Sequence, residues 1–140
     1  MEAKAIAKYV RMSPSKLQPV ADLIRGKDLQ EALTILKFTS GKGAELIEKV
    51  VMSAAANAEN NHDMDPGNLY VAEVYANQGP TMKRFRAGAQ GRASMILKRS
   101  SHIGVTLKER EAEKPAEAKP AKAEKAEKKA EGGSSDGSES

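Results

Sequence analysis

The spacing of apolar residues changes near residue 68, and this change limits the folds that are open to the chain. Between residues 13 and 60, apolar side chains recur at every third or fourth position, which is the period of an amphipathic α-helix. In the segments 69–76, 101–108 and 3–10 they alternate with other residues, as in a β-strand. The sequence therefore predicts an α+β fold in which three helices pack on one face of a small three-stranded antiparallel sheet.

The first two helices are predicted from the residues at their ends. Ser13-Pro14 is typical of an N-cap and a first turn, and Arg25-Gly26 is typical of a helix end. Pro19 lies inside this pattern and predicts a kink or a later start. The second helix follows Asp28, which has the spacing of a capping box with Glu31.

The third helix, roughly residues 43–60, is expected to be the central one, because its apolar face is the longest. In the strand 69–76, strict alternation predicts two faces, with Tyr70, Ala72 and Val74 on one and Val71, Glu73 and Tyr75 on the other. In the strand 101–108, the same rule places Ile103, Val105 and Leu107 on one face.

Residues 79–99, GPTMKRFRAGAQGRASMILKR, contain six cations, three glycines and no carboxylate. Together with the strand signals on both sides, this segment predicts a long protruding β-hairpin that continues both strands, with about ten residues and about 30 Å per arm. A two-stranded ribbon is marginally stable in water. We therefore expect a polyanion to hold it straight, since arginine offers forked donors that match phosphate oxygens. The alternative is a solvated, flexible loop.

The positive charge belongs to residues 1–110, which carry 17 Lys and Arg against 11 Asp and Glu, a net charge of +6. Residues 111–140 carry 6 against 8, a net charge of −2, and contain no aromatic or branched aliphatic residue. Such a segment cannot bury enough surface to offset its chain entropy. We expect one domain over residues 1–110 and a disordered Ala/Lys/Glu-rich tail over residues 111–140.

Several functional classes are disfavoured by what the sequence contains. With no cysteine, neither a disulfide framework nor a thiolate metal site is available, which fits a reducing cytosol. No apolar run approaches the roughly 20 residues that span a bilayer. The sequence therefore predicts a soluble intracellular protein.

No catalytic or metal-binding pattern emerges from the sequence. The two histidines, His62 and His102, have no cysteine or serine nucleophile at a recognisable spacing. Gly41-Lys42 resembles the Gly-Lys pair near the end of a P-loop motif, but the residues before and after it do not match the motif. Asp63 and Asp65 lack the later bidentate glutamate of a calcium loop. We expect no enzyme activity, no cofactor, no metal and no small-molecule substrate.

Four segments, RMSPSKLQPVADLIRGK, SAAANAENNHDM, GPTMKRFRAGAQGRA and ILKRSSHI, occur in an order and spacing that closely resemble the bacterial large-ribosomal-subunit protein L22 family. The resemblance runs from about Ala3 to Leu107. It implies a cytoplasmic constituent of the large ribosomal subunit that binds 23S rRNA and stabilises its assembly. It also implies a hairpin whose tip lines the nascent-peptide exit tunnel, with rRNA, neighbouring large-subunit proteins and the nascent peptide as partners.

The resemblance carries over to particular residues of the hairpin. Lys83-Arg84, Gly91-Arg92 and Lys98-Arg99 match its basic and glycine positions, where the cations would neutralise phosphates. With the body cations and two polar residues, the candidate rRNA-binding residues are Lys8, Arg11, Ser13, Lys16, Arg25, Lys83, Arg84, Arg86, Arg92, Lys98, Arg99 and His102. The candidate tunnel-lining residues of the tip are Arg86, Ala87, Gly88, Ala89, Gln90, Gly91 and Arg92.

The sequence departs from the usual family pattern at Ala87, Gly88 and Gln90, and at Gln18-Pro19.

Two other classes of function compete with the ribosomal one. A β-ribbon regulator outside the ribosome would read base edges, for which the hairpin offers Gln90 beside its arginines. A membrane-surface protein would need aromatic and aliphatic residues opposite its cations, and the candidates are too few and not on one face: Phe85, Met95, Ile96 and Leu97.

Overall fold

A computed structural model describes residues 1–110, and it confirms the predicted α+β fold with three helices and a small antiparallel sheet. The prediction of a disordered tail concerns residues 111–140, which lie outside the described residues. In chain order the elements are β1 (Glu2–Val10), α1 (Pro14–Ile24), α2 (Leu29–Phe38), α3 (Lys42–His62), a 3₁₀ turn (Pro66–Asn68), β2 (Leu69–Gln78), β3 (Met82–Ala87), a second 3₁₀ turn (Ala89–Gly91), β4 (Ala93–Lys98) and β5 (Ser101–Glu109).

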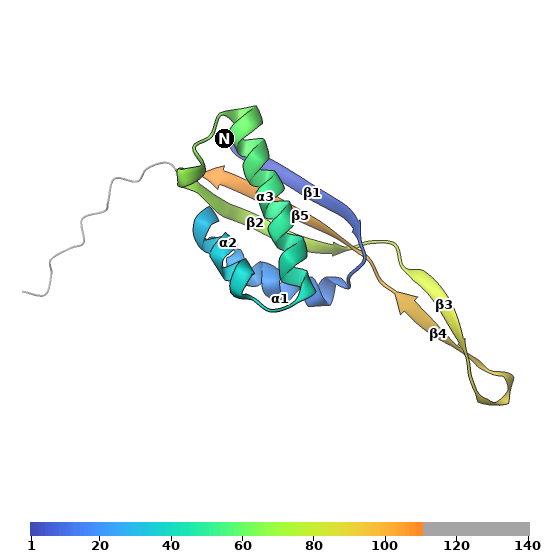
Figure 1. Cartoon of the computed structure of the whole chain (residues 1–140). Helices are drawn as coiled ribbons and strands as arrows, with labels where there is room; N and C mark the ends of the chain where they lie inside the picture. Colours follow the sequence, from blue (N-terminus) through green and yellow to red (C-terminus); the bar gives the residue numbers. More distant parts are fainter. Residues whose placement is uncertain (111–140) are drawn as a thin grey trace, which may run out of the picture.

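The main sheet has the strand order β1-β5-β2, and both pairs are antiparallel. The three helices cover one face of this sheet, while β3 and β4 extend beyond it as a separate ribbon (Figure 1). Glu2, Leu69 and Glu109 lie together at the end of the sheet that is opposite this ribbon. The ribbon therefore leaves the domain from the end where β1 finishes and β5 begins.

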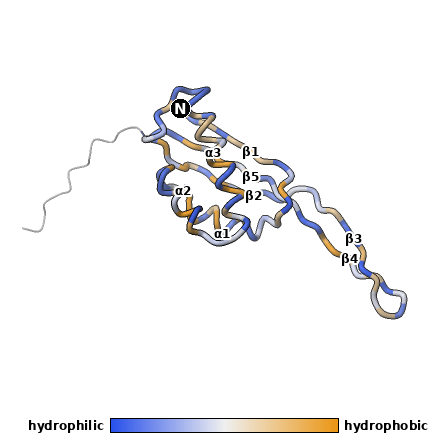
Figure 2. Tube along the Cα trace, in the orientation of Figure 1, coloured by the Kyte–Doolittle hydropathy of each residue, from blue (hydrophilic) through white to orange (hydrophobic). Residues whose placement is uncertain are grey.

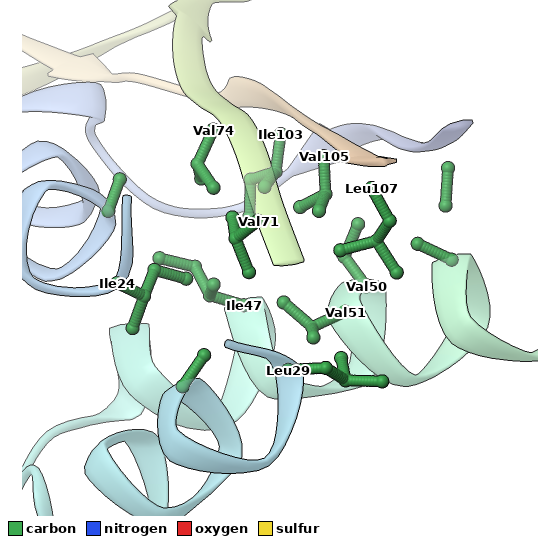
Figure 3. Close-up of a cluster of buried hydrophobic side chains, with 14 of the residues drawn as sticks. Ile24, Leu29, Ile47, Val50, Val51, Val71, Val74, Ile103, Val105 and Leu107 are labelled. Atoms are coloured by element: carbon green, nitrogen blue, oxygen red, sulfur yellow. The ribbon is translucent and has the colours of Figure 1, made fainter. Parts of the chain in front are cut away.

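The core lies between the helices and the covered face of the sheet (Figure 3). Ile47 and Val51 of α3 are completely buried and lie near the strand residues Val71 and Leu107. The alternation predicted for β5 is confirmed, because Ile103, Val105 and Leu107 are all buried on the core side. Helix α3 thus occupies the central position that its long apolar face predicted.

The two faces predicted for the strand 69–76 are wrong. Val71 and Val74 are both buried in the core, although strict alternation places them on opposite faces. The pairing with β5 shifts between Val71 and Glu73, so Ala72 is an extra residue in β2. A β-bulge of this kind reverses the face of every later residue. Tyr75 consequently points away from the helices and is exposed.

Helix α1 starts at Pro14, as the Ser13-Pro14 pair predicted, and continues through Pro19. The predicted later start is therefore wrong. Pro19 has no N–H to donate to the carbonyl of Ser15, four residues earlier. Both residues are exposed, so water can reach the carbonyl that is left without a partner.

Replacing Pro19 with alanine is expected to raise the free energy of unfolding by about 1 to 2 kcal/mol, because the substitution restores one helix hydrogen bond. The gain should stay below the roughly 3 kcal/mol cost of an internal helix proline, because proline also restricts the unfolded chain. Urea-induced unfolding followed by circular dichroism measures the change. The exposed neighbour Gln18 provides the control, and Gln18→Ala should stay within about 0.5 kcal/mol of the wild type. An unchanged or lower stability for Pro19→Ala would contradict the argument.

The capping box predicted at the start of α2 does not form. Asp28 occupies the N-cap position, but its side chain accepts no hydrogen bond from the first turn of the helix. Instead, its carboxylate accepts from the Arg110 guanidinium at 3.0 Å, and the carboxylate of Glu31 pairs with Lys27 at 2.7 Å. Nearby cations therefore hold both carboxylates away from the free amides of the helix.

Candidate nucleic-acid interface

The segment 79–99 folds as a β-hairpin in which β3 and β4 pair with each other in a two-stranded sheet of their own. Each arm has six paired residues, so the paired ribbon is about 20 Å long, shorter than the predicted 30 Å. The prediction that the ribbon continues the main sheet is wrong, because β3 and β4 form a separate sheet. The ladder is interrupted at Pro80, which has no N–H to donate. Here the Gly79 amide donates to Ser100 O at 2.9 Å, and the Ser100 hydroxyl donates to Pro80 O at 2.6 Å.

The register of the hairpin separates its side chains into two different faces. Met82 pairs with Lys98, Arg84 with Ile96 and Arg86 with Ser94, so three cations share one face. The other face holds the cross-strand partners Lys83 and Leu97, Phe85 and Met95, and Ala87 and Ala93. Hydrophobic positions accordingly appear on the ribbon as well as in the domain (Figure 2).

The prediction that Phe85, Met95, Ile96 and Leu97 are not all on one face is confirmed, because Ile96 lies on the cationic side. The other three nevertheless share one face, which the sequence did not indicate. Counting along each strand could not show this, because the face depends on which residues are opposite each other across the hairpin. Phe85 is 70% exposed. The ribbon thus has a mainly cationic face and a mainly apolar face.

The tip reverses the chain through two residues in the left-handed backbone region. Gln90 has φ 57° and Gly91 has φ 69°, and the Gly88 amide donates to Arg92 O at 2.7 Å to close the turn. Glycine takes this conformation without strain, whereas Gln90 does not. The tip residues 86–92 are exposed.

A cavity of about 370 Å³ lies where the hairpin meets the start of α1. Its lining contains four cations and no carboxylate: Arg11, Met12, Ser13, Lys16, Leu97, Lys98 and Arg99. The Ser13 hydroxyl is paired with Ser15 at 2.8 Å and does not cap the helix. We call this cavity the root pocket. It brings together five of the predicted rRNA-binding residues from two distant parts of the sequence.

The cations of the hairpin and the root pocket have no carboxylate partner within the part of the chain that the structure describes. At the opposite end of the sheet the charges are balanced instead. There the Lys4 ammonium lies 2.8 Å from the Glu2 carboxylate, which lowers the pKa of Glu2 and raises the pKa of Lys4. The unpaired positive charge is therefore concentrated on the end of the molecule that carries the ribbon.

The remaining predicted rRNA-binding residues lie outside the root pocket. Arg25 is engaged within the protein, because its guanidinium donates to Val74 O at 3.0 Å and lies 2.9 Å from Asp22. Lys8 is exposed on β1. His102 lies near the base of the ribbon and accepts a hydrogen bond from the Tyr9 amide at Nδ1. Tyr9 is a residue that the sequence reasoning did not select.

Within residues 1–110, no group of three or more histidine, aspartate or glutamate side chains is arranged to hold a metal ion. In the same part of the chain, no helix is both long enough and apolar enough to cross a bilayer.

An α+β domain with a cationic ribbon and an acid-free pocket at its base is typical of proteins that bind nucleic acid. Comparison with known proteins specifies the family. The family described as Ribosomal protein L22p/L17e matches residues 5–108, and the chain belongs to it. This is a family of structural, non-enzymatic proteins.

Individual relatives support the same assignment. The chain is 62% identical to the large ribosomal subunit protein uL22 of Clostridioides difficile (strain 630) over 110 residues, which cover 79% of this chain and 99% of that protein. It is 59% identical to the uL22 protein of Clostridium novyi (strain NT) over 110 residues, with the same coverage. The corresponding protein of Carboxydothermus hydrogenoformans is 57% identical over 110 residues, which cover 79% of this chain and 97% of that protein.

Proposed function

We propose that the chain is a structural constituent of the large ribosomal subunit in the cytoplasm, where it binds 23S rRNA and stabilises its folded arrangement. The observation that carries this proposal is the set of unpaired cations on the ribbon and around the root pocket, in a chain of this family. A polyanion is the partner that suits such a surface, because like charges this close together repel each other and its phosphates neutralise them.

The arms and the root pocket are proposed to hold rRNA phosphates. Arg84, Arg86 and Lys98 share one face of the ribbon, and Arg11, Lys16 and Arg99 surround the pocket. An rRNA strand that enters the pocket can therefore meet cations from the ribbon and from the body of the domain at once. Lys8, Ser13, Lys83, Arg92 and His102 complete the proposed contacts. Arg25 is left out, because its guanidinium is already bonded inside the protein.

The tip is proposed to line the nascent-peptide exit tunnel, which makes the nascent peptide a partner in addition to rRNA and neighbouring ribosomal proteins. Residues 86–92 are exposed at the end of the ribbon that is far from the domain. A narrow ribbon can pass between rRNA segments where a globular domain cannot. We further propose that residues 1–110 form a single rRNA-binding domain. The predicted tail 111–140 has no part in this proposal.

The proposed function is tested by the sedimentation of the tagged chain in a cell lysate. We expect the chain to sediment with the large subunit at low salt, where its contacts with phosphates are strongest. A regulator outside the ribosome would sediment with other nucleic acid or at the position of a free protein. Treatment of the lysate with ribonuclease provides the control and should release the chain. Recovery of the chain away from large subunits, in untreated lysate, would contradict the proposal.

A further inference from the structure

Tyr9 is a strained and exposed aromatic residue at the base of the ribbon. Its φ is +59°, in the left-handed region that a bulky residue rarely adopts. The pairing of β1 with β5 is irregular at this point, with a shift between Ala7 and Val10. Tyr9 is 66% exposed, so packing in the core does not explain the conformation. Backbone strain of this kind often occurs where a side chain must be held in place for a function.

His102 holds Tyr9 in this conformation through two contacts. The Tyr9 amide donates to His102 Nδ1 at 3.0 Å, and the two rings meet edge to face with their centroids 5.0 Å apart and an angle of 88° between their planes. Gly79 lies directly against the imidazole, where an added Cβ would come within 3.3 Å of the ring and within 2.7 Å of the Ser100 hydroxyl. The position of His102 is therefore fixed by the backbone of the ribbon, and His102 in turn fixes Tyr9.

The hydrogen bond to Tyr9 also sets the tautomer of His102. A backbone amide can only donate, so Nδ1 is the acceptor and the proton of the neutral imidazole is on Nε2. Among residues 1–110, Nε2 donates no hydrogen bond to the protein. His102 thus offers a donor beside the ring of Tyr9. The two rings are perpendicular and Tyr9 is largely exposed, so a flat group can stack on the tyrosine ring.

We propose that Tyr9 and His102 form a binding site for one unpaired RNA base, which stacks on the tyrosine ring while His102 Nε2–H donates to an oxygen of the same nucleotide. This proposal rests on the proposed function, and it adds a base contact to a surface that otherwise binds phosphates. Lys8 and Arg11 flank Tyr9 in the sequence, and neither forms an ion pair within the described residues. An aromatic ring between free cations matches a nucleotide, whose base stacks while its phosphates are neutralised.

The test compares Tyr9→Gly with Tyr9→Phe in binding to a fragment of large-subunit rRNA at one fixed salt concentration. Glycine adopts φ +59° without strain and keeps the amide that donates to His102, so Tyr9→Gly removes the ring and preserves the backbone. Base stacking on an aromatic ring predicts that Tyr9→Gly weakens binding about 5- to 150-fold. Tyr9→Phe keeps the ring and should bind like the wild type.

The slope of affinity against salt should be the same for the wild type and both variants, because no cation is removed. Urea unfolding shows whether Tyr9→Gly is folded, and if it is not, Tyr9→Asn, which also tolerates a left-handed backbone, replaces it. Equal affinities for Tyr9→Gly and Tyr9→Phe would overturn the inference while leaving the proposed function intact. A ring that contacts a neighbouring protein would give this same result, since the fragment contains only RNA. Failure of the wild type to bind the fragment would instead refute the proposed function.

Discussion

Affinity of the protein for a large-subunit rRNA fragment is expected to fall by about 10³- to 10⁵-fold between about 50 and 200 mM salt. The ribbon contributes six cations, and Lys8, Arg11 and Lys16 add three more from the body. None of them is paired with a carboxylate within residues 1–110, so each is free to displace a counterion from a phosphate. A binding titration at four or five salt concentrations measures the slope.

Two single substitutions make this prediction specific. Arg84→Ala should lower the slope by about one, because it removes one phosphate contact from the cationic face of the ribbon. Lys49→Ala should leave the slope unchanged, because Lys49 lies on α3 and pairs with Glu45 at 3.1 Å. An affinity that hardly depends on salt, or an equal effect of both substitutions, would show that the free cations are not what binds RNA.

The helices and the sheet could be predicted because their apolar residues are local signals. A helix of the length of α3 repeats its apolar face many times, so an error at one position changes little. The extra residue Ala72 had the opposite effect, since a single bulge reversed the predicted faces of β2. Pro80 was visible in the sequence, and its missing N–H could have indicated that the hairpin would separate from the main sheet.

The cations of the candidate interface could be predicted from the sequence, but their arrangement around one pocket could not. Arg11 and Lys16 are more than eighty residues away from Lys98 and Arg99, and only the fold shows that they surround one pocket. Tyr9 was missed because it occupied an ordinary position in an alternating strand. Its left-handed backbone results from the irregular pairing with β5 and from His102, which are both distant in sequence.

We expect the arms of the ribbon to determine incorporation into large subunits, and the tip to determine the shape of the exit tunnel. Replacing the arm cations Lys83, Arg84 and Arg99 together with alanine should strongly reduce incorporation into large subunits. Each charged contact to a phosphate is worth roughly 1.5 to 3 kcal/mol where it is well desolvated. The protein content of purified subunits measures incorporation. A matched control removes three cations from elsewhere in the domain, Lys37, Lys49 and Lys108, and should leave incorporation unchanged.

Deletion of residues 87–90 should have the opposite effects, because incorporation into large subunits should be kept while inhibition by tunnel-binding antibiotics should change. The deletion removes no cation, and it leaves Arg86 and Ser94 paired across a three-residue loop that contains Gly91. Loops of this length with a glycine close β-hairpins readily. The shortened ribbon should therefore keep its phosphate contacts and enter subunits, while the wall of the exit tunnel changes shape at its tip. Inhibition of translation by several chemically different tunnel-binding antibiotics should change accordingly. If the deletion blocks incorporation as severely as loss of the arm cations, or leaves inhibition by all of these antibiotics unchanged, the division between anchoring arms and a tunnel-lining tip is wrong.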